Sequence, residues 1–98
     1  MPIQVLLADD HLIVRQGLKA LLEREGFKVV GEAADGHEAV RLAQALRPDV
    51  AVLDLAMPLL NGLEAAREIL RISSRTRTIL LTMHPEDHYI FEALRAGV

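Results

Sequence analysis

The 98-residue sequence contains no cysteine and no tryptophan, and only 3% of its residues are aromatic. The absence of cysteine excludes disulfide bonds and thiolate metal sites, and it fits a reducing cytoplasmic location. No apolar run approaches the roughly 20 residues that a membrane-spanning helix needs, and Asp9 and Asp10 interrupt the apolar start too early for a signal peptide. We therefore expect a cytoplasmic domain with an aliphatic core and no membrane partner.

The sequence also lacks an excess of positive charge and the glycine-rich motifs of phosphate-binding loops. Eleven Lys and Arg residues are scattered among fourteen Asp and Glu residues, which gives a net charge of -3 and a pI of about 5.7. This balance predicts that the chain itself does not bind nucleic acid. The sequence contains neither G-x-x-x-x-G-K-[ST] nor G-x-G-x-x-G, so it gives no support to nucleotide chemistry.

What the sequence does contain is an alternation of short apolar runs with segments of helical period. The apolar runs predict strands at residues 3–8, 27–33, 50–53 and 78–82. Helices are predicted between them and after the last one, at residues 12–25, from Asp35-Gly36 to Pro48, around residues 63–70 and at 87–96. The order βαβαβαβα predicts an α/β fold, a doubly wound parallel sheet with helices on both faces.

Each predicted helix carries an apolar stripe that should face the sheet. In the first helix Arg15, Lys19 and Glu23 would lie opposite the stripe, and Gly26 would end the helix as a C-terminal cap. The stripe residues of the first three helices are Val14, Leu18, Leu21 and Leu22; Ala39, Val40, Ala43 and Leu46; and Leu63, Ala66, Ile69 and Leu70.

Carboxylates and a hydroxyl stand at the ends of three predicted strands. Asp9 and Asp10 end the first strand, Asp54 the third and Thr82 the fourth. A parallel sheet brings these ends to one edge, where ligands usually bind. Close carboxylates repel one another, and a hard cation such as Mg²⁺ relieves that repulsion. The pattern therefore predicts a metal-assisted phosphoryl site in which an aspartate is the nucleophile.

A structural interpretation of the acidic residues stands beside this one. A single Asp after a strand is most often a helix N-cap or an Asx-turn residue. We interpret Asp35, Asp49 and Asp87 in this way. Met57 is interpreted as a packing residue. The histidines have no metal-ligand spacing with a second histidine, and His11, His37 and His88 are interpreted as solvated or capping residues.

Four stretches in order resemble the receiver (phosphoacceptor) domain of two-component response regulators. These are "VLLADDH", "VAVLDLAMPLLNG", "ILLTMH" and "EALRAGV", and the last, with "ADDHLIVRQGLKALLE", resembles the NarL/FixJ subfamily, which carries a LuxR-type output domain. The resemblance covers the whole chain. It implies a flavodoxin-like fold of five strand–helix units, of which this chain holds (βα)4.

The resemblance implies a role for each matched position. Asp54 would accept a phosphoryl group from a sensor histidine kinase, with Mg²⁺ bound directly by Asp10 and largely through water by Asp9. The backbone carbonyl of Ala56 would be a further metal ligand, and Thr82 would hydrogen-bond the phosphoryl oxygen on activation. The domain would not be an enzyme beyond assisting its own phosphotransfer and autodephosphorylation.

The resemblance also assigns positions around these residues. Pro58 and Gly62 would shape the loop after the phosphoacceptor, with Gly62 allowing a backbone conformation that a side chain disfavours. The side chains of Ala56 and His84 occupy positions that tune the lifetime of the phosphoryl group. From its neighbours alone, His84 is interpreted as a surface loop residue.

The chain departs from the family by ending after the fourth predicted helix. The fifth strand, its helix, the lysine that pairs with the phosphoryl group and the DNA-binding domain all fall outside residues 1–98. Removing an edge strand exposes backbone and apolar surface. We therefore expect a piece of a longer regulator that forms a homodimer or a swapped assembly along the fourth strand, with DNA bound only by the parent's output domain.

Two other functions remain as alternatives at this point. A pseudo-receiver would serve as a binding or dimerisation module without accepting phosphate, and the missing lysine favours it. A Mg²⁺-dependent phosphotransfer enzyme of flavodoxin-like topology would differ from a switch by turning over a phosphate ester repeatedly. The intact acidic trio favours the switch.

Overall fold

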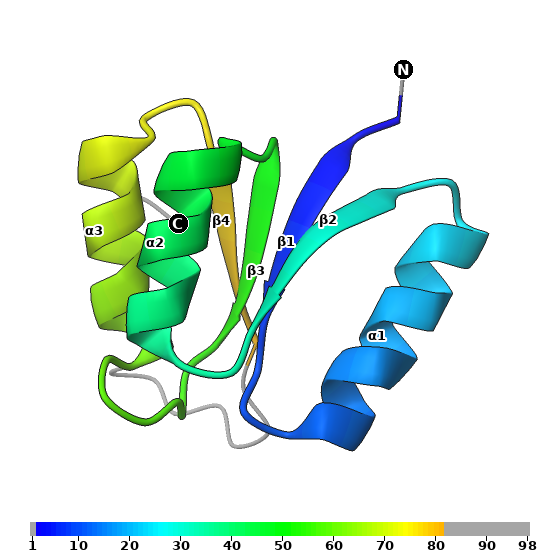
Figure 1. Ribbon diagram of the computed structural model, residues 1–98, viewed down its shortest axis with the longest axis horizontal. Helices are drawn as coiled ribbons and strands as arrows, with labels where there is room; N and C mark the ends of the chain where they lie inside the picture. Colours follow the sequence, from blue (N-terminus) through cyan, green and yellow to red (C-terminus); the bar gives the residue numbers. More distant parts are fainter. Residues whose placement is uncertain (1, 82–98) are drawn as a thin grey trace.

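A computed structural model describes residues 2–81 of the chain, and Thr82, His84 and the predicted last helix lie outside the described residues. Seven elements alternate along this part (Figure 1). They are β1 (Gln4–Ala8), α1 (Leu12–Arg24), β2 (Lys28–Ala33), α2 (Gly36–Leu46), β3 (Val50–Asp54), α3 (Gly62–Ile72) and β4 (Arg77–Leu81). Among the described residues, no helix combines the length and apolar character that crossing a membrane requires.

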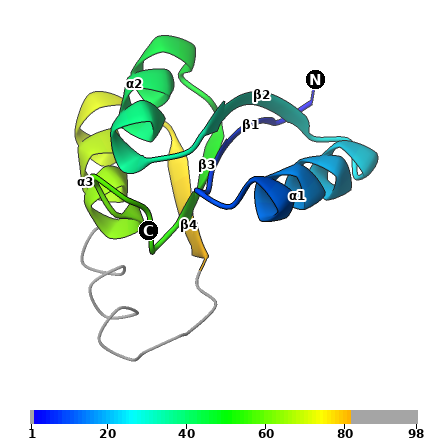
Figure 2. The ribbon, with the colours of Figure 1, turned by 60° about the horizontal axis from the view of Figure 1, so that its bottom comes forward.

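The four strands form one parallel sheet in the order β2-β1-β3-β4. Helix α1 lies on one face of the sheet, and α2 and α3 lie together on the other (Figures 1 and 2). This is the doubly wound arrangement that the alternating sequence predicted. The order confirms that the first, third and fourth strands are neighbours, so their carboxyl ends share one edge.

Local side-chain chemistry fixes where the helices begin and end. The Asp35 carboxylate caps α2 by accepting a hydrogen bond from the Glu38 N–H at 2.8 Å, as predicted. Asn61 and Glu64 form a reciprocal capping box at the start of α3. Gly26 follows α1 with φ +94°, the left-handed conformation that confirms its predicted role as a C-terminal cap.

The core lies between the sheet and the pair α2 and α3, and small side chains allow a close approach there. Alanines of both helices are fully buried against Leu6 of β1 and Leu53 of β3, together with Ile69. Met57 belongs to the same cluster, which confirms its predicted packing role. Three details of the predicted stripes of α2 and α3 are wrong, because Leu46 and Leu70 are exposed and Ala65, which was not predicted in a stripe, is buried. The buried helix alanines are Ala39, Ala43, Ala65 and Ala66.

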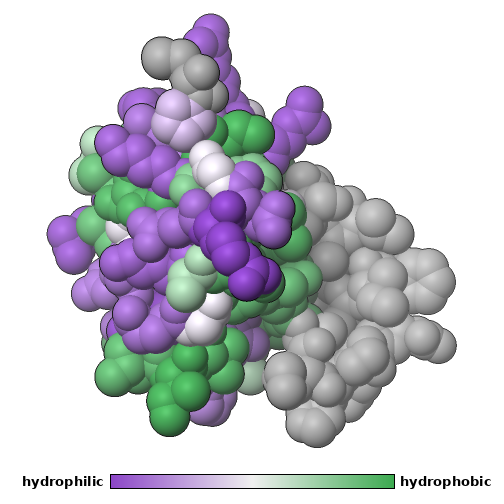
Figure 3. Space-filling view, turned by 90° about the vertical axis from the view of Figure 1, so that its right-hand side faces the viewer, coloured by the Kyte–Doolittle hydropathy of each residue, from purple (hydrophilic) through white to green (hydrophobic). Residues whose placement is uncertain are grey.

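The packing of α1 differs from the sequence prediction. None of its residues is buried, and Val14 and Leu21 of the predicted stripe are exposed. Arg15 and Lys19, predicted to lie opposite the stripe, instead bind Glu32 of β2. Figure 3 views the side of the molecule on which α1 lies, where hydrophilic residues cover much of the surface and hydrophobic patches lie among them.

Asp49 also departs from its predicted role as a cap or turn residue. It precedes β3, and its carboxylate accepts a hydrogen bond from the N–H of Gln4 at 2.8 Å. Its own N–H donates to the Gln4 carbonyl at 2.9 Å. Asp49 therefore ties the start of β1 to the start of β3, across 45 positions of sequence. A contact of that range has no local sequence signature.

Candidate functional site

The carboxyl ends of β1 and β3 carry three aspartates that the structure brings together. Ala8 and Leu53 are register partners, so Asp9 and Asp54, the next residue on each chain segment, meet at the same edge. Asp10 follows at once. One ligand atom from each of these aspartates and from His11 lies within 4.8 Å of the others. The adjacency of β1 and β3 thus creates a cluster from residues 45 positions apart.

Asp54 is largely withdrawn from water, and its side chain is only 13% exposed. Burial is the main cause that raises its pKa above the usual aspartate value, and the charges of Asp9 and Asp10 add to that effect. The Ala56 N–H, which donates to Oδ1 of Asp54 at 3.2 Å, and the nearby His11 lower the pKa in part. The raised pKa expresses mainly the cost of burying a charged carboxylate, to which the two neighbouring carboxylates add.

His11 is exposed to solvent, as interpreted from the sequence, but its imidazole also belongs to this cluster. It occupies the N-cap position of α1, but its side chain makes no capping bond. Its Nδ1 lies 3.2 Å from Oδ1 of Asp9 and 3.0 Å from Oδ1 of Asp10. The hydrogen bond with Asp9, followed by the charge of Asp10, raises the pKa of the imidazole. The only sequence signal was its position next to the acidic pair.

Arg15 is a second residue that the sequence analysis missed. Its Nη1 donates to the backbone carbonyl of Asp9 at 2.7 Å, and its Nε donates to Oε1 of Glu32 at 3.0 Å. Lys19 and Gln16 donate to the same Glu32 carboxylate. Burial raises the pKa of Glu32, but the hydrogen bonds and charges of Arg15 and Lys19 outweigh it and hold the pKa below its ordinary value. This polar clamp joins α1, β2 and the acidic loop.

The loop after Asp54 is tightly turned. The N–H of Leu60 donates to the Pro58 carbonyl at 2.7 Å, and Leu59 between them has φ +69°. This is the geometry of a γ-turn, in which a left-handed leucine is strained. The Pro58 carbonyl is the acceptor that closes this turn.

Gly62 is required for a different reason from the one expected. Its φ is not in the left-handed region. Instead, a Cβ at this position would lie 2.3 Å from the Asp54 carbonyl oxygen and 2.8 Å from the carbonyl carbon. The first turn of α3 thus packs directly against the peptide of Asp54, and only glycine permits that approach. This contact fixes the backbone that carries the Asp54 carboxylate.

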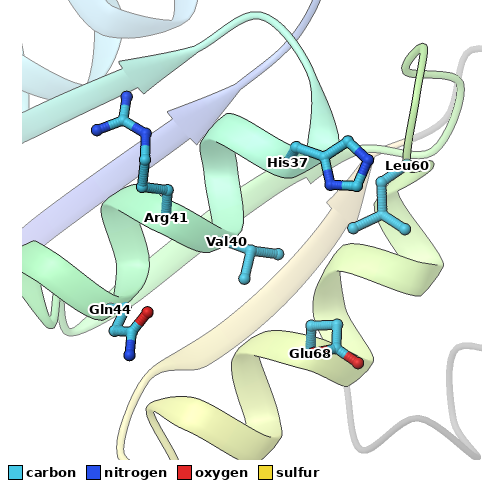
Figure 4. A pocket seen from close by; sticks show the side chains of 6 residues that line it. All are labelled: His37, Val40, Arg41, Gln44, Leu60 and Glu68. Carbon is cyan, nitrogen blue, oxygen red and sulfur yellow. The ribbon is translucent and has the colours of Figure 1, made fainter.

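A separate groove of about 420 Å³ lies between α2 and α3, lined by His37, Val40, Arg41, Gln44, Leu60 and Glu68 (Figure 4). His37 and Leu60 approach each other at one end. The groove has the volume of a small ligand site. Its single lining carboxylate, that of Glu68, does not make an acidic cluster, so the strand ends remain the candidate site.

The donor set at the strand ends suits a hard divalent cation. It offers carboxylate oxygens from three residues in a small volume, and Mg²⁺ prefers oxygen ligands of this kind. The charges of Asp9 and Asp10 add to the effect of burial in raising the pKa of Asp54, and a bound cation would offset this repulsion. Asp9, Asp10 and Asp54 therefore fit the cation that the sequence predicted, whereas Thr82 lies outside the described residues.

The sequence matches the response regulator receiver domain family over residues 5–98. It is 46% identical over 96 residues to the transcriptional regulatory protein LiaR of Bacillus subtilis (strain 168), covering 97% of this chain and 46% of that protein. The chain spans about half the length of the curated relatives it matches.

Solved structures give the same result for the fold. A crystal structure of a LuxR-family two-component response regulator from Aurantimonas sp. SI85-9A1 is similar with a TM-score of 0.94 and 40% identity, over 100% of this chain and 71% of that one. The CheX–CheY–BeF3–Mg+2 complex from Borrelia burgdorferi gives a TM-score of 0.94 and 27% identity, over 99% and 74% of the two chains. The likeness in sequence and in fold covers nearly the whole chain.

Proposed function

Because this chain belongs to the response regulator receiver domain family and has its flavodoxin-like fold, we propose that it is a phosphorylatable switch of a two-component system. Asp54 accepts the phosphoryl group, and a sensor histidine kinase donates it. The observation that carries the proposal is the clustering of the Asp54 carboxylate with those of Asp9 and Asp10 at the shared edge of β1 and β3.

The proposed reaction uses the chain's own residues as follows. An oxygen of the Asp54 carboxylate attacks phosphorus, the bond from phosphorus to the kinase histidine breaks, and its electron pair leaves with the imidazole. The Ala56 N–H orients the Asp54 carboxylate by donating a hydrogen bond to Oδ1.

The cation site is proposed to use Asp10 directly, Asp9 largely through water, Asp54 and the carbonyl of Ala56. Bound Mg²⁺ would offset the negative charge of the transferring group. Arg15 holds the Asp9 backbone and the first turn of α3 holds the Asp54 backbone, so both sides of the site are fixed before a phosphoryl group arrives. Thr82 is proposed to bind the phosphoryl oxygen.

The output of the switch follows from the relatives. They are transcriptional regulators, and the similar structures include LuxR-family response regulators. We propose that residues 1–98 form the receiver part of a cytoplasmic regulator whose DNA binding resides in a separate output domain. In isolation the chain is proposed to pair with a second copy along β4, where Ile79 and Leu81 are exposed.

Phosphorylation is tested by incubating the chain with Mg²⁺ and a small acyl phosphate and measuring its intact mass. We expect a gain of one phosphoryl group in the unsubstituted 98-residue chain and none in Asp54→Ala. Asp35→Ser is the matched control, because it removes a carboxylate outside the cluster and keeps a residue able to cap α2. It should gain the phosphoryl group normally.

Other outcomes identify the competing functions. No gain in a chain that still unfolds cooperatively would overturn the switch and favour a pseudo-receiver that binds or dimerises without phosphate. Release of many phosphates per chain would indicate a phosphotransfer enzyme. A gain that persists in Asp54→Ala would place the acceptor elsewhere.

A further inference from the structure

The imidazole of His11 faces the three carboxylates of the cation site. We propose that Nδ1 of His11 is a ligand of the bound cation, and that it gives the site a preference for borderline cations such as Co²⁺ over Mg²⁺. The inference deepens the proposed function, since it rests on the same cation site at Asp9, Asp10 and Asp54.

The distances around Nδ1 match those between the ligands of one octahedral ion. With bonds of about 2.1 Å, adjacent ligand atoms are about 3.0 Å apart and opposite ones about 4.2 Å. Nδ1 lies 3.0 Å from Oδ1 of Asp10, which corresponds to one edge, and 3.2 Å from Oδ1 of Asp9, which is proposed to bind the cation largely through water. It lies 4.0 Å from Oδ2 of Asp54, which corresponds to a diagonal.

The backbone around His11 is fixed on both sides. Its N–H donates to Oδ1 of Asp9 at 2.8 Å, and its carbonyl accepts from the N–H of Arg15 at 2.9 Å. Its side chain has no capping bond to α1, so the ring is available to the cluster. The side chain is 67% exposed, which leaves Nε2 free to bind water while Nδ1 faces the carboxylates.

The ligand chemistry determines what the imidazole contributes. Mg²⁺ is a hard cation that takes oxygen ligands, and a neutral nitrogen adds little to its affinity. Imidazole binds first-row transition metals well, and affinity rises from Mn²⁺ through Co²⁺ to Cu²⁺. A site of carboxylates plus His11 should therefore discriminate among divalent cations more strongly than carboxylates alone.

A competing explanation makes the opposite prediction. If the ring were only an internal countercharge, a cation would have to displace it from Asp9 and Asp10. Removing the ring would then tighten the binding of every divalent cation. If the ring is instead a ligand, removing it should weaken cation binding, and the affinity for the transition metal should fall most.

The test measures the Kd of Mg²⁺ and of Co²⁺ by calorimetry on the full 98-residue chain at about pH 8, because a metal binds the neutral imidazole. The variants are His11→Ala and His11→Asn, the second of which keeps a good N-cap residue for α1. His37→Ala is the matched control, since His37 is an exposed histidine that lines the groove between α2 and α3.

We expect both His11 variants to bind Co²⁺ about tenfold more weakly or worse, while the Kd of Mg²⁺ changes less than about threefold. His37→Ala should match the parent. Equal weakening of both cations, tighter binding of both, or no change in either would overturn the inference. Thermal unfolding without metal shows whether each variant is folded.

Phosphorylation of the same variants separates this inference from the proposed function. Mg²⁺-dependent phosphorylation that persists in His11→Ala supports the switch whichever way the Co²⁺ result falls. A parent chain that binds Co²⁺ through His11 but never accepts phosphate would support the ligand and overturn the switch.

Discussion

The two faces of the sheet are held by different forces. On one face, alanines of α2 and α3 reach full burial beside Ile69, and contact with Leu6 and Leu53 is close and apolar. On the other face α1 has no buried residue and is joined to β2 by a polar clamp around Glu32. Close apolar packing is destabilised when a buried side chain is shortened, whereas the polar clamp is weakened when its charges are neutralised.

The difference matters because each face holds one side of the cation site. The α3 face supports Asp54 through the contact of Gly62, and the α1 face supports Asp9 through Arg15. Stability should therefore depend mainly on the first face. The second face should affect the site through charge and be sensitive to pH.

The largest effect should come from removing volume on the α2 and α3 face. Ile69→Ala leaves a cavity at a fully buried position and should cost about 2–5 kcal/mol in the free energy of unfolding. Ile13→Ala on α1, where the residue is 88% exposed, should change stability by less than about 0.5 kcal/mol. Urea unfolding measures both, and equal costs would contradict the comparison.

A pair of glycine substitutions sharpens the same contrast. Gly62→Ala places a Cβ against the Asp54 peptide, which should lower the free energy of unfolding by about 1–3 kcal/mol. It should also reduce phosphorylation of Asp54. In Gly17→Ala the new Cβ in α1 has no atom within 4 Å, and the higher helix propensity of alanine should raise the free energy of unfolding by about 0.5–1 kcal/mol. Thermal unfolding with the mass assay tests the pair, and normal uptake in Gly62→Ala would refute the proposed role of the contact.

The polar clamp should give a pH dependence of smaller size. The lowered pKa of Glu32 means that its ion pairs stabilise the fold above the ordinary glutamate pKa of 4.5. That contribution is lost as the pH falls through the lower folded-state value. Glu32→Gln should therefore lower stability at neutral pH by less than about 1 kcal/mol and flatten the acid side of the profile. An unchanged acid profile would argue against the clamp.

The smallest predicted change is a gain in stability. The raised pKa of Asp54 means that stability falls as the pH rises from the ordinary aspartate pKa of 3.8 through the folded-state pKa, above which the loss is complete. Without divalent cations, Asp54→Asn should raise stability by about 0.5 kcal/mol, after discounting for solvent screening. That corresponds to about 2–4 °C in Tm. Added Mg²⁺ should stabilise the parent and leave Asp54→Asn much less affected.

The order of strands and helices along the chain followed from the sequence because its signals are local. Continuous apolar runs predicted buried strands, and the capping residues Asp35 and Gly26 marked helix ends through their own backbone contacts. The clustering of Asp9, Asp10 and Asp54 could also be predicted, since a parallel sheet places strand ends at one edge.

The errors have a common physical cause. Arg15, Lys19 and Asp49 were assigned to solvent or local turns, but each binds a partner far along the chain. An apolar stripe predicts which residues lie on the same face of a helix. What that face contacts depends on the side chains of the neighbouring strand. The strand next to α1 is β2, and the carboxylate of Glu32 on β2 binds the side chains of Arg15 and Lys19.

By itself, the sequence determined the alternation of strands and helices, the family resemblance and the three acidic strand ends, because periodicity and residue type act over a few positions. Only the tertiary structure decided that His11 joins the acidic cluster, that Arg15 and Glu32 hold α1, and that Gly62 packs against Asp54. Those contacts arise where strand register and helix approach bring distant backbones together, and no local pattern encodes such distances.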